Sequence, residues 1–361
     1  MKALILAGGS GTRLRPITHT RAKQLVPVAN TPILFRGIQA MVEAGITDIG
    51  VVVGDTAAEM RAAIGDGSQF GPGVTATYIE QEAPLGLAHG VLIAREFLGD
   101  DDFVMYLGDN MLEQGLVGFV DAFEGARSSA NPPSAQILLK QVSDPQRFGI
   151  AVLDDEGHVT TLVEKPEVPP SNYALVGVYL FDASIHEAVA SIEPSDRGEL
   201  EITDAIQWLI DHDLRVRTEI LTGWWIDTGK LTPLLEANRL ILETIESRID
   251  GSVDAASFLD GRVIVETGAE IVNSTIRGPV AIGARTRIVD SFIGPFSAIG
   301  ADCEVVHSEI EHSVVMDSSK VIEIPRLEDS LIGSDAVVSR SKRKPRALRL
   351  MVGDHCRIDI E

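Results

Sequence analysis

The sequence predicts an α/β protein in which a mixed, mostly parallel sheet domain is followed by a parallel β-helix. Up to about residue 230, short apolar runs alternate with amphipathic segments, the order typical of parallel strands covered by helices. After residue 250, isoleucine and valine recur every five or six residues, as in a solenoid of hexapeptide units. At 361 residues the chain also exceeds the usual size of a single core, so we expect two domains, 1–250 and 251–361.

The elements of the first domain follow from the spacing of apolar residues. Strands are expected near 2–7, 48–54, 74–80, 103–107, 135–142, 149–154, 159–163, 173–182 and 214–221. Helices are expected near 33–44, 86–97, 184–192 and 201–212, and one long amphipathic helix over 231–249. In the first helix, Ile33, Gly37, Ile38 and Met41 share the face that should pack on the sheet. The crowded strands of the second half suggest an added antiparallel portion.

The β-helix prediction depends on a repeat of 17 residues. Val265, Ile282 and Ile299 are each 17 residues apart, and every such interval contains three steps of five or six, so each coil should have three sides. Ile-Gly pairs beginning at residues 282, 293 and 299 mark the corners. The pattern continues less regularly through Met316, Ile322, Leu327, Ile332 and Val338, and resumes at Val352 and Ile358. The basic stretch 340–346 between them is interpreted as a solvated loop, with phosphate binding as the alternative.

The composition excludes several classes of partner. A formal net charge of −22 argues against nucleic acid and acidic membranes, which need a basic face, so an anionic substrate must be held by locally placed cations. Only Cys303 and Cys356 are present, too few for a disulfide framework. The sequence shows no signal-like start and no apolar run long enough to span a membrane. We expect a reduced, cytoplasmic protein.

A glycine-rich loop directly follows the first apolar strand. Gly8, Gly9 and Gly11 allow successive N–H groups to approach phosphate oxygens, and Arg13 and Lys23 add positive charge. The dinucleotide fingerprint is excluded because Leu14 occupies the place of its third glycine, and the Gly-Lys-Ser/Thr of the P-loop is absent. In open α/β sheets ligands bind beyond the carboxyl ends of the strands, where residues 8–13 and 108–110 both fall. We expect these two segments to face each other.

The string Gly-Gly-Ser-Gly-Thr-Arg-Leu-Arg-Pro-Ile-Thr at 8–18, with Lys-Gln-Leu-Val-Pro at 23–27, resembles the signature of sugar-1-phosphate nucleotidylyltransferases, especially the long glucose-1-phosphate thymidylyltransferases. The resemblance spans residue 1 to about 245. It implies a Rossmann-like nucleotidyltransferase domain, a left-handed β-helix and Mg²⁺ as cofactor. The implied reaction is thymidylyl transfer from dTTP to glucose-1-phosphate, giving dTDP-glucose and pyrophosphate.

The resemblance also assigns site residues. The implied catalytic residues are Arg13, Lys23, Asp109, Lys165 and Asp227, of which Asp109 and Asp227 would hold the magnesium. The implied nucleotide contacts are Leu6, Ala7, Gly8, Gly9, Gly11, Thr12, Arg13, Gln81, Pro84, Gly86 and Asp109. The implied sugar-phosphate contacts are Gly149, Glu164, Lys165, Val176, Tyr179 and Trp225.

The residue types suit these roles. Asp109 follows an apolar strand, where carboxylates commonly bind Mg²⁺, and the amide of Gln81 offers the donor and acceptor that a pyrimidine edge requires. In Glu164-Lys165-Pro166 the carboxylate would accept sugar hydroxyls and the cation would contact the phosphate. Phe148 lacks the phenolic hydroxyl that many relatives carry there. Residues 197–204 are interpreted as a helix start first and sugar-site support second.

Three alternatives stay open at this point. Transfer from UTP or GTP is one, because thymine and uracil differ only by a methyl group. A second is additional acyltransfer in the β-helix with His307, His312 or His355 as base. A non-catalytic sugar-nucleotide sensor is the third. The β-helix itself is expected to be structural and to mediate homo-oligomer formation.

Overall fold

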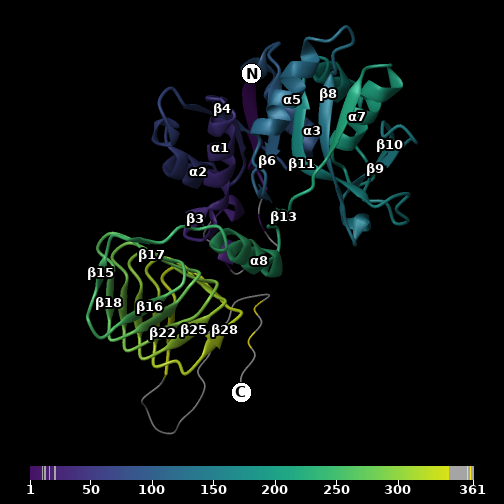
Figure 1. The fold of residues 1–361 in the computed structure, drawn as a ribbon. Coiled ribbons are helices and arrows are strands. Elements are labelled where there is room, and N and C mark those ends of the chain that lie inside the picture. Colours follow the sequence, from purple (N-terminus) through teal and green to yellow (C-terminus); the bar gives the residue numbers. More distant parts are fainter. Residues whose placement is uncertain are drawn as a thin grey trace. The chain divides into compact units, whose positions relative to one another are not determined.

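The computed structural model describes residues 1–9, 11, 14, 15, 17–19, 22–340, 356 and 358 (Figure 1). These residues pack into two compact units. The α/β unit takes its residues from Met1–Ser10 and Leu34–Ile226, and the β-helix unit from Gly11–Ile33 and Asp227–Glu361. The glycine-rich loop is therefore shared between the units, although domains 1–250 and 251–361 were expected from the sequence. That domain division stays a prediction, and each unit is described on its own.

The α/β unit is built on a mixed sheet with a parallel centre. Strand β1 (Lys2–Leu6) lies between β4 (Asp48–Val53) and β6 (Phe103–Leu107), and β5 (Thr75–Glu80) extends the parallel part beside β4. Strand β11 (Tyr173–Phe181) runs antiparallel to β6 and to both β8 (Ala135–Gln141) and β9 (Gly149–Leu153). Strand β10 (Val159–Glu164) is antiparallel to β9, and β12 (Val216–Ile220) is parallel to β8. The mixed sheet and its added antiparallel portion are confirmed.

Helices of the α/β unit follow the expected order with two differences. The predicted helices near 33–44, 184–192 and 201–212 are α1 (Ile33–Glu43), α6 (Ile185–Ser191) and α7 (Ile202–Asp211). The predicted helix over 86–97 is interrupted at Ala94, which separates α3 (Leu87–Ile93) from α4 (Arg95–Leu98). The sequence did not predict α2 (Ala57–Ile64) or α5 (Val117–Arg127). Short elements complete this part of the chain: η4 (Ser68–Phe70), β7 (Asn110–Leu112), η5 (Pro145–Arg147) and β13 (Trp225–Asp227).

Packing of α1 on the sheet explains its glycine. A side chain at Gly37 would place its Cβ 2.8 Å from a ring carbon of Tyr106, so only glycine lets the buried tyrosine of β6 fit under the helix. Ile33, Ile38 and Met41 are fully buried on the same side, as predicted. Phe103, on the same strand as Tyr106, is also fully buried.

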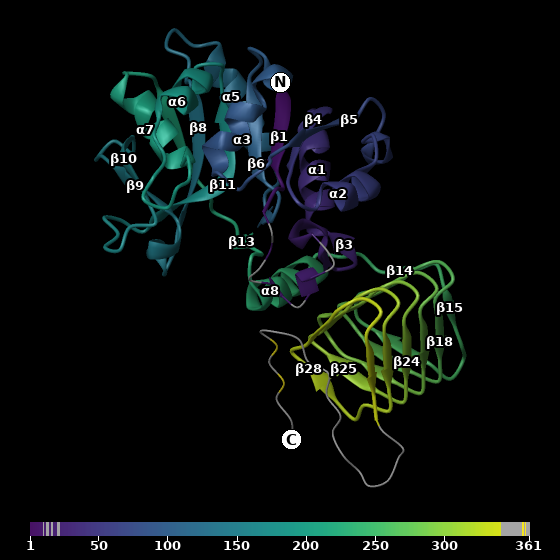
Figure 2. The same cartoon turned by 180° about the vertical axis from the view of Figure 1, so that it is seen from behind.

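The β-helix unit has three parallel sheets, one for each side of a coil (Figures 1 and 2). The first contains β14 (Arg248–Ile249), β17 (Val263–Val265), β20 (Val280–Ile282), β23 (Ser297–Ile299), β26 (Val314–Val315) and β29 (Leu331–Ile332). The second contains β15 (Ser252–Val253), β18 (Glu270–Val272), β21 (Arg287–Val289), β24 (Glu304–Val306), β27 (Lys320–Ile322) and β30 (Val337–Ser339). The third contains β16 (Phe258–Asp260), β19 (Thr275–Arg277), β22 (Phe292–Ile293), β25 (Glu309–Glu311) and β28 (Leu327–Glu328).

The strand register confirms the predicted 17-residue coil. Val265 pairs with Ile282 and Ile282 with Ile299, and all three side chains are fully buried in the column that fills the β-helix. This three-sided stack is the fold class expected from the repeat, and its geometry is consistent with the implied left-handed form. Of the later repeat residues, Ile322, Leu327, Ile332 and Val338 lie in strands, whereas Met316 directly follows β26. The predicted resumption at Val352 and most of the basic stretch 340–346 lie outside the described residues.

A ladder of serine hydroxyls at one corner joins successive coils. The hydroxyl of Ser274 accepts the N–H of Ser291, and that of Ser291 accepts the N–H of Ser308, each at 3.1 Å. Each hydroxyl also donates to a carbonyl two residues earlier in its own coil. Because these N–H groups are buried, the hydroxyls satisfy donors that the strand pairing does not reach. The apolar repeat alone did not reveal this ladder.

The helix predicted over 231–249 is wrong in its second half. Helix α8 (Leu231–Leu242) ends early, and Arg248 and Ile249 form β14, which pairs with Ile264 and Val265 of the next coil. Apolar residues at 245 and 249 fit helical spacing, but the parallel pairing available on the first coil satisfies the backbone of residues 248 and 249 instead. The remaining elements of this unit are η2 (Ile17–His19), η3 (Lys23–Leu25), β2 (Pro27–Val28) and β3 (Thr31–Pro32). Within the described part of the chain, no helix has the length and apolar character needed to cross a membrane.

Candidate active site

The carboxyl ends of the parallel strands bring two predicted segments together. Leu6 of β1 pairs with Leu107 of β6, and the N–H of Gly108 donates to the carbonyl of Leu6 at 3.0 Å. Gly8 and Asp109, each two residues beyond this pair, therefore leave the sheet at the same edge. Ala7 is fully buried, and its N–H donates to Val52 of β4 at 2.9 Å. The expectation that the glycine-rich loop and residues 108–110 share this edge is confirmed for the residues that belong to the α/β unit.

Gln81 lies at the end of β5 beside the start of the glycine-rich loop. A Cβ on Gly8 would lie 3.0 Å from the Oε1 of Gln81, and a Cβ on Gly54 would lie 2.8 Å from the carbonyl oxygen of Gly8. Glycine is required at both positions because three strand ends converge there. The Nε2 of Gln81 donates to the carbonyl of Gly86 at 3.4 Å and lies 3.0 Å from the Nδ1 of His89. The sequence did not predict a role for His89. Its position three residues after Gly86, on the first turn of α3, could have indicated that it lies near Gln81.

Gly86 is fixed by contact with residue 200. Its φ of +105° is unfavourable for side chains, and a Cβ there would lie 2.4 Å from the carbonyl oxygen of Leu200. Leu200 in turn donates its N–H to Leu85 at 2.8 Å and accepts that of Ala88 at 3.0 Å. Pro84 is exposed in the same loop. The loop that carries Gln81 is thus attached to the segment before α7.

Asp109 is partly buried beside a network that the sequence did not predict. Asn110, 3% exposed, donates to Oδ1 of Asp109 at 3.2 Å and accepts the indole N–H of Trp225 at 2.6 Å. The Tyr106 hydroxyl donates to the Asn110 carbonyl at 2.7 Å. Burial, and then the nearby charge of Asp109, raise the pKa of Tyr106, which keeps the phenol a neutral donor. Asn110 therefore links the predicted metal ligand Asp109 with the predicted sugar contact Trp225.

A second cluster surrounds Glu164 at the end of β10. Its Oε1 lies 2.7 Å from the Nζ of Lys165 and 3.5 Å from the guanidinium of Arg197, and its Oε2 accepts from the hydroxyl of Thr203 at 3.3 Å. Gly149 pairs with Glu164 across the strands, and a Cβ on this glycine would lie 3.0 Å from that Oε2. The same Cβ would lie 2.7 Å from the Cγ2 of Thr203, so a side chain at residue 149 would displace both Thr203 and Glu164. Lys165 has a φ of 40° and donates its N–H to Phe148 at 3.0 Å.

The segment 197–204 lies against this cluster, while its second predicted role, support of a sugar site, stays a prediction. Arg197 lies 3.1 Å from each of Glu199 and Glu201 in addition to Glu164. Burial chiefly raises the pKa of Glu201, and burial followed by the charge of Glu164 raises the pKa of Asp204. One guanidinium thus balances several carboxylates that would otherwise repel one another.

The remaining predicted sugar contacts differ in accessibility. Val176 is fully buried and Tyr179 is 3% exposed, both on β11, so their roles as ligand contacts stay predictions. Burial first and the Glu164 charge second raise the pKa of Tyr179. Trp225 is partly exposed, with its ring centre 5.0 Å from that of Phe148. This aromatic pair connects the Glu164 cluster with Asn110 and Asp109.

Two predicted catalytic residues belong to the β-helix unit. Lys23 begins η3, and a Cβ on Gly11, which has a φ of +63°, would lie 3.0 Å from the Cβ of Lys23. Thr18 donates its hydroxyl to the Gly11 carbonyl at 2.7 Å, which closes this part of the loop. Asp227 ends β13, and its Oδ1 accepts the N–H of Gly229 at 2.9 Å. Thr12 and Arg13 lie outside the described residues.

The candidate bases for acyl transfer are held by acidic neighbours. The Nδ1 of His307 lies 3.6 Å from Asp290 at an exposed corner of the β-helix. His312 is bonded to Asp329, and its ring meets that of Phe296 edge-on at 6.1 Å. These contacts agree with structural roles. His355 lies outside the described residues.

Comparisons with known proteins find a matching family model, relatives of full length and a similar solved structure. Residues 2–244 match the family model described as nucleotidyl transferase. The chain is 55% identical to a glucose-1-phosphate thymidylyltransferase of Streptomyces griseus, over 100% of this chain and 99% of that protein. It is 54% identical to a protein of the same name from Streptomyces antibioticus, over 100% of both chains. A solved Bacillus anthracis structure named as a glucose-1-phosphate thymidylyltransferase, with bound sucrose, is 34% identical with a TM-score of 0.62 and covers 69% of this chain and 98% of its own.

Proposed function

Because this chain belongs to the nucleotidyl transferase family, we propose that it transfers a thymidylyl group from dTTP to glucose-1-phosphate, producing dTDP-glucose and pyrophosphate. The observation that carries the proposal is the 55% identity, along the whole chain, to a protein named for that reaction. Asp109 offers a carboxylate of the kind that binds a metal, and Lys165, beside Glu164, offers a cation suited to a sugar phosphate; both roles are part of the proposal.

We propose a direct displacement at the α-phosphorus. The phosphate of glucose-1-phosphate is already an anion able to attack, so the protein has to position it and to stabilise negative charge. Lys165, held beside Glu164, would orient the attacking phosphate, and Glu164 would accept sugar hydroxyls. Gly8 and Gly11, with Lys23, would hold the triphosphate. Both cysteines lie in the β-helix sequence, where Cys303 is buried and burial raises the pKa of its thiol to about 11, so a thiolate nucleophile is not offered by Cys303.

We further propose Mg²⁺ as the cofactor, held by Asp109 and Asp227. The fit is chemical: both groups are partly exposed carboxylates at strand ends, and oxygen ligands of this kind suit Mg²⁺. The ion would supply positive charge at the α-phosphate. An exposed group in the turn after β9, formed by Asp154, Glu156 and His158, also has ligand atoms within 4.8 Å of one another. Asp154 accepts hydrogen bonds from the backbone N–H groups of Glu156 and His158, and these bonds account for the geometry of the group without a metal.

Nucleotide choice is the first test. We expect dTTP to be preferred or shared with UTP, and GTP and ATP to be poor, because the Gln81 amide suits a pyrimidine edge. We also expect a base pocket closed at Gly86 to be too small for a purine. The measurement is pyrophosphate release with glucose-1-phosphate and each of the four triphosphates. A kcat/KM for GTP comparable to that for dTTP would assign the chain to guanylyl transfer.

The metal proposal predicts that Asp109→Asn and Asp227→Asn each reduce kcat by about 10²-fold or more while the protein stays folded. The amide keeps the size of the side chain but removes the charge that binds Mg²⁺. The readouts are steady-state turnover and titration of the metal dependence, with Asp155→Asn, an exposed turn residue, as the control. Turnover and Mg²⁺ dependence like those of the unaltered enzyme in both variants would contradict the assignment.

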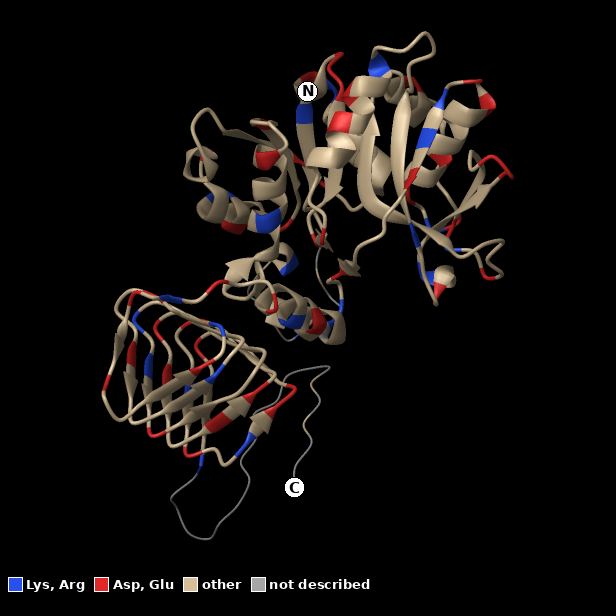
Figure 3. Ribbon diagram, viewed as in Figure 1, with Lys and Arg blue, Asp and Glu red and all other residues tan. Residues whose placement is uncertain are grey.

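We also propose that the protein forms homo-oligomers through the β-helix. On the second sheet Glu270, Arg287, Glu304 and Lys320 stack in register with alternating charge, as the red and blue segments of Figure 3 illustrate. The charges on that face neutralise one another. Strand β16, in contrast, is an edge strand, and its Phe258 is 59% exposed. Phe258→Lys should therefore lower the mass measured by sedimentation equilibrium, with Ala256→Lys, at an exposed position of the adjoining turn, as the control. A monomer at all concentrations, before any substitution, would refute association.

A further inference from the structure

We infer that the β-helix positions the nucleotide-binding loop, through a buried asparagine of α8 and an asparagine of the turn that follows Lys23. The inference goes beyond the proposed function but rests on it in one respect, the role of Lys23 at the triphosphate. All residues that carry it belong to the β-helix unit. It gives the C-terminal region a part in catalysis without placing any of its residues against the substrate.

The turn in question connects β2 and β3. Ala29 and Asn30 have φ angles of 45° and 61°, and Val28 pairs with Thr31 in a two-residue hairpin. Left-handed conformations at two successive residues are typical of a tight hairpin turn, but alanine gains nothing from them. Contacts from outside the hairpin must therefore stabilise the turn at Ala29.

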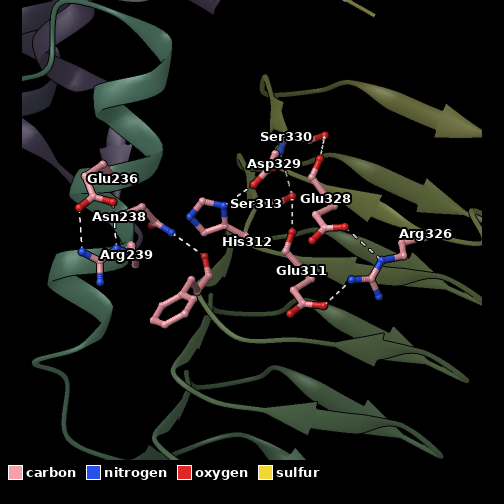
Figure 4. Close-up of polar contacts among 11 residues, drawn as sticks. Glu236, Asn238, Arg239, Glu311, His312, Ser313, Arg326, Glu328, Asp329 and Ser330 are labelled. Atoms are coloured by element: carbon pink, nitrogen blue, oxygen red, sulfur yellow. Dashed lines mark hydrogen bonds and ion pairs between the residues drawn. The ribbon is translucent and has the colours of Figure 1, made fainter. Parts of the chain in front are cut away.

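The first such contact is made by Asn238 of α8. Its side chain is fully buried, and its Oδ1 accepts the N–H of Ala29 at 2.9 Å. Its Nδ2 donates to the carbonyl of Phe296 at 2.9 Å, and Figure 4 shows Asn238 on α8 beside the β-helix corner. One amide thus joins the hairpin to a corner of the β-helix, and both its oxygen and its nitrogen form a hydrogen bond. A buried amide is costly unless it is bonded, so this geometry is strongly specified.

The corner at Phe296 is itself held on several sides. Phe296 has a φ of 62° and donates its N–H to Pro279 at 2.8 Å, and its ring lies 6.0 Å from the guanidinium of Arg239 and 6.1 Å from the ring of His312. Arg239 is paired with Glu236 on α8, as Figure 4 shows. The carbonyl that Asn238 contacts therefore belongs to a well-packed part of the β-helix.

A second contact comes from the turn itself. The Nδ2 of Asn30 donates to the carbonyl of Ile299 at 2.8 Å, at the end of β23. Ile299 is fully buried and stacks in register on Ile282 and Val315. The hairpin is thus bonded to two carbonyls of the same coil, one directly and one through Asn238.

The restraint reaches Lys23 through the short stretch that precedes the hairpin. Val26 donates its N–H to Lys23 and accepts that of Ile33, each at 3.2 Å, and it is fully buried. Lys23 in turn packs against Gly11 of the glycine-rich loop. Ile17 lies near Gly333 in the coil formed by β29 and β30, since its Cδ1 would be 3.8 Å from a Cβ placed on that glycine. The segment that contains Lys23 is therefore bonded to the β-helix through the hairpin that follows it.

A fixed position matters because a charge stabilises a transition state only where it is preorganised. A loop segment held only by its own short hairpin would have to be ordered when the nucleotide binds, at a cost in conformational entropy. The β-helix contributes that order in advance.

The test is Asn30→Gly, with Asn273→Gly as the matched control. Glycine keeps the left-handed turn and removes only the donor to Ile299. Asn273 also has a left-handed φ, of 45°, and also donates through Nδ2, to Asp290, but at a β-helix corner with no part in residues 11–33. We expect Asn30→Gly to lower kcat by about 3- to 10-fold, a fraction of the roughly 10²-fold that a 1 Å misplacement can cost. Amide hydrogen exchange should accelerate in residues 22–28, and Asn273→Gly should change neither property.

A second variant removes both bonds of the bridge. Asn238→Ala should lower kcat further and accelerate hydrogen exchange in the same residues. If this variant does not fold, Asn30→Gly alone tests the inference. Unchanged kcat and unchanged exchange in Asn30→Gly would overturn the inference. Equal changes in the Asn273→Gly control would overturn it as well, because they would indicate general loosening. If the unaltered protein makes no dTDP-glucose, the proposed function fails, whereas the exchange comparison still tests the restraint.

Discussion

The parallel pairing of β1 with β6 is the interaction on which the candidate site depends. It aligns Leu6 with Leu107, so the glycine-rich loop and Asp109 leave the sheet side by side. The pairing of β1 with β4 then brings Gly54 against Gly8, and β5 delivers Gln81 to the same edge. A shift in the register of β1 would move the loop away from both the carboxylate and the amide.

Crowding at this edge explains which residues are glycine. Gly8, Gly86 and Gly149 each have a backbone atom or a polar side-chain atom within about 3 Å of the position a Cβ would occupy. In each case the neighbour is fixed or functional: Gln81, Leu200 or Glu164. The polar residues around them are also held in pairs, as Asn110 is by Tyr106 and Trp225. The edge is therefore arranged before any ligand binds, as charge stabilisation requires.

Much of this architecture was predictable because it is periodic. The strand pattern located β1 and β6, and the 17-residue repeat predicted the coil register before any contact was known. The long helix over 231–249 failed because Ile249 fits both the helical spacing and a first β-helix strand, and pairing with the next coil decided between them. His89, Asn110 and Asn238 were not predicted because their roles depend on partners far away in the sequence. A polar residue that bonds across elements leaves no period in the sequence, so its role emerges only from the fold.

In the proposed reaction the protein positions the two substrates and stabilises negative charge, and it does not supply a nucleophile. Its most direct test is the stereochemistry of the reaction at the α-phosphorus, measured with a chiral dTTP analogue carrying sulfur at that position. A single in-line displacement predicts inversion in the dTDP-glucose analogue that forms. Net retention would require two displacements through a covalent enzyme intermediate, and would contradict the mechanism.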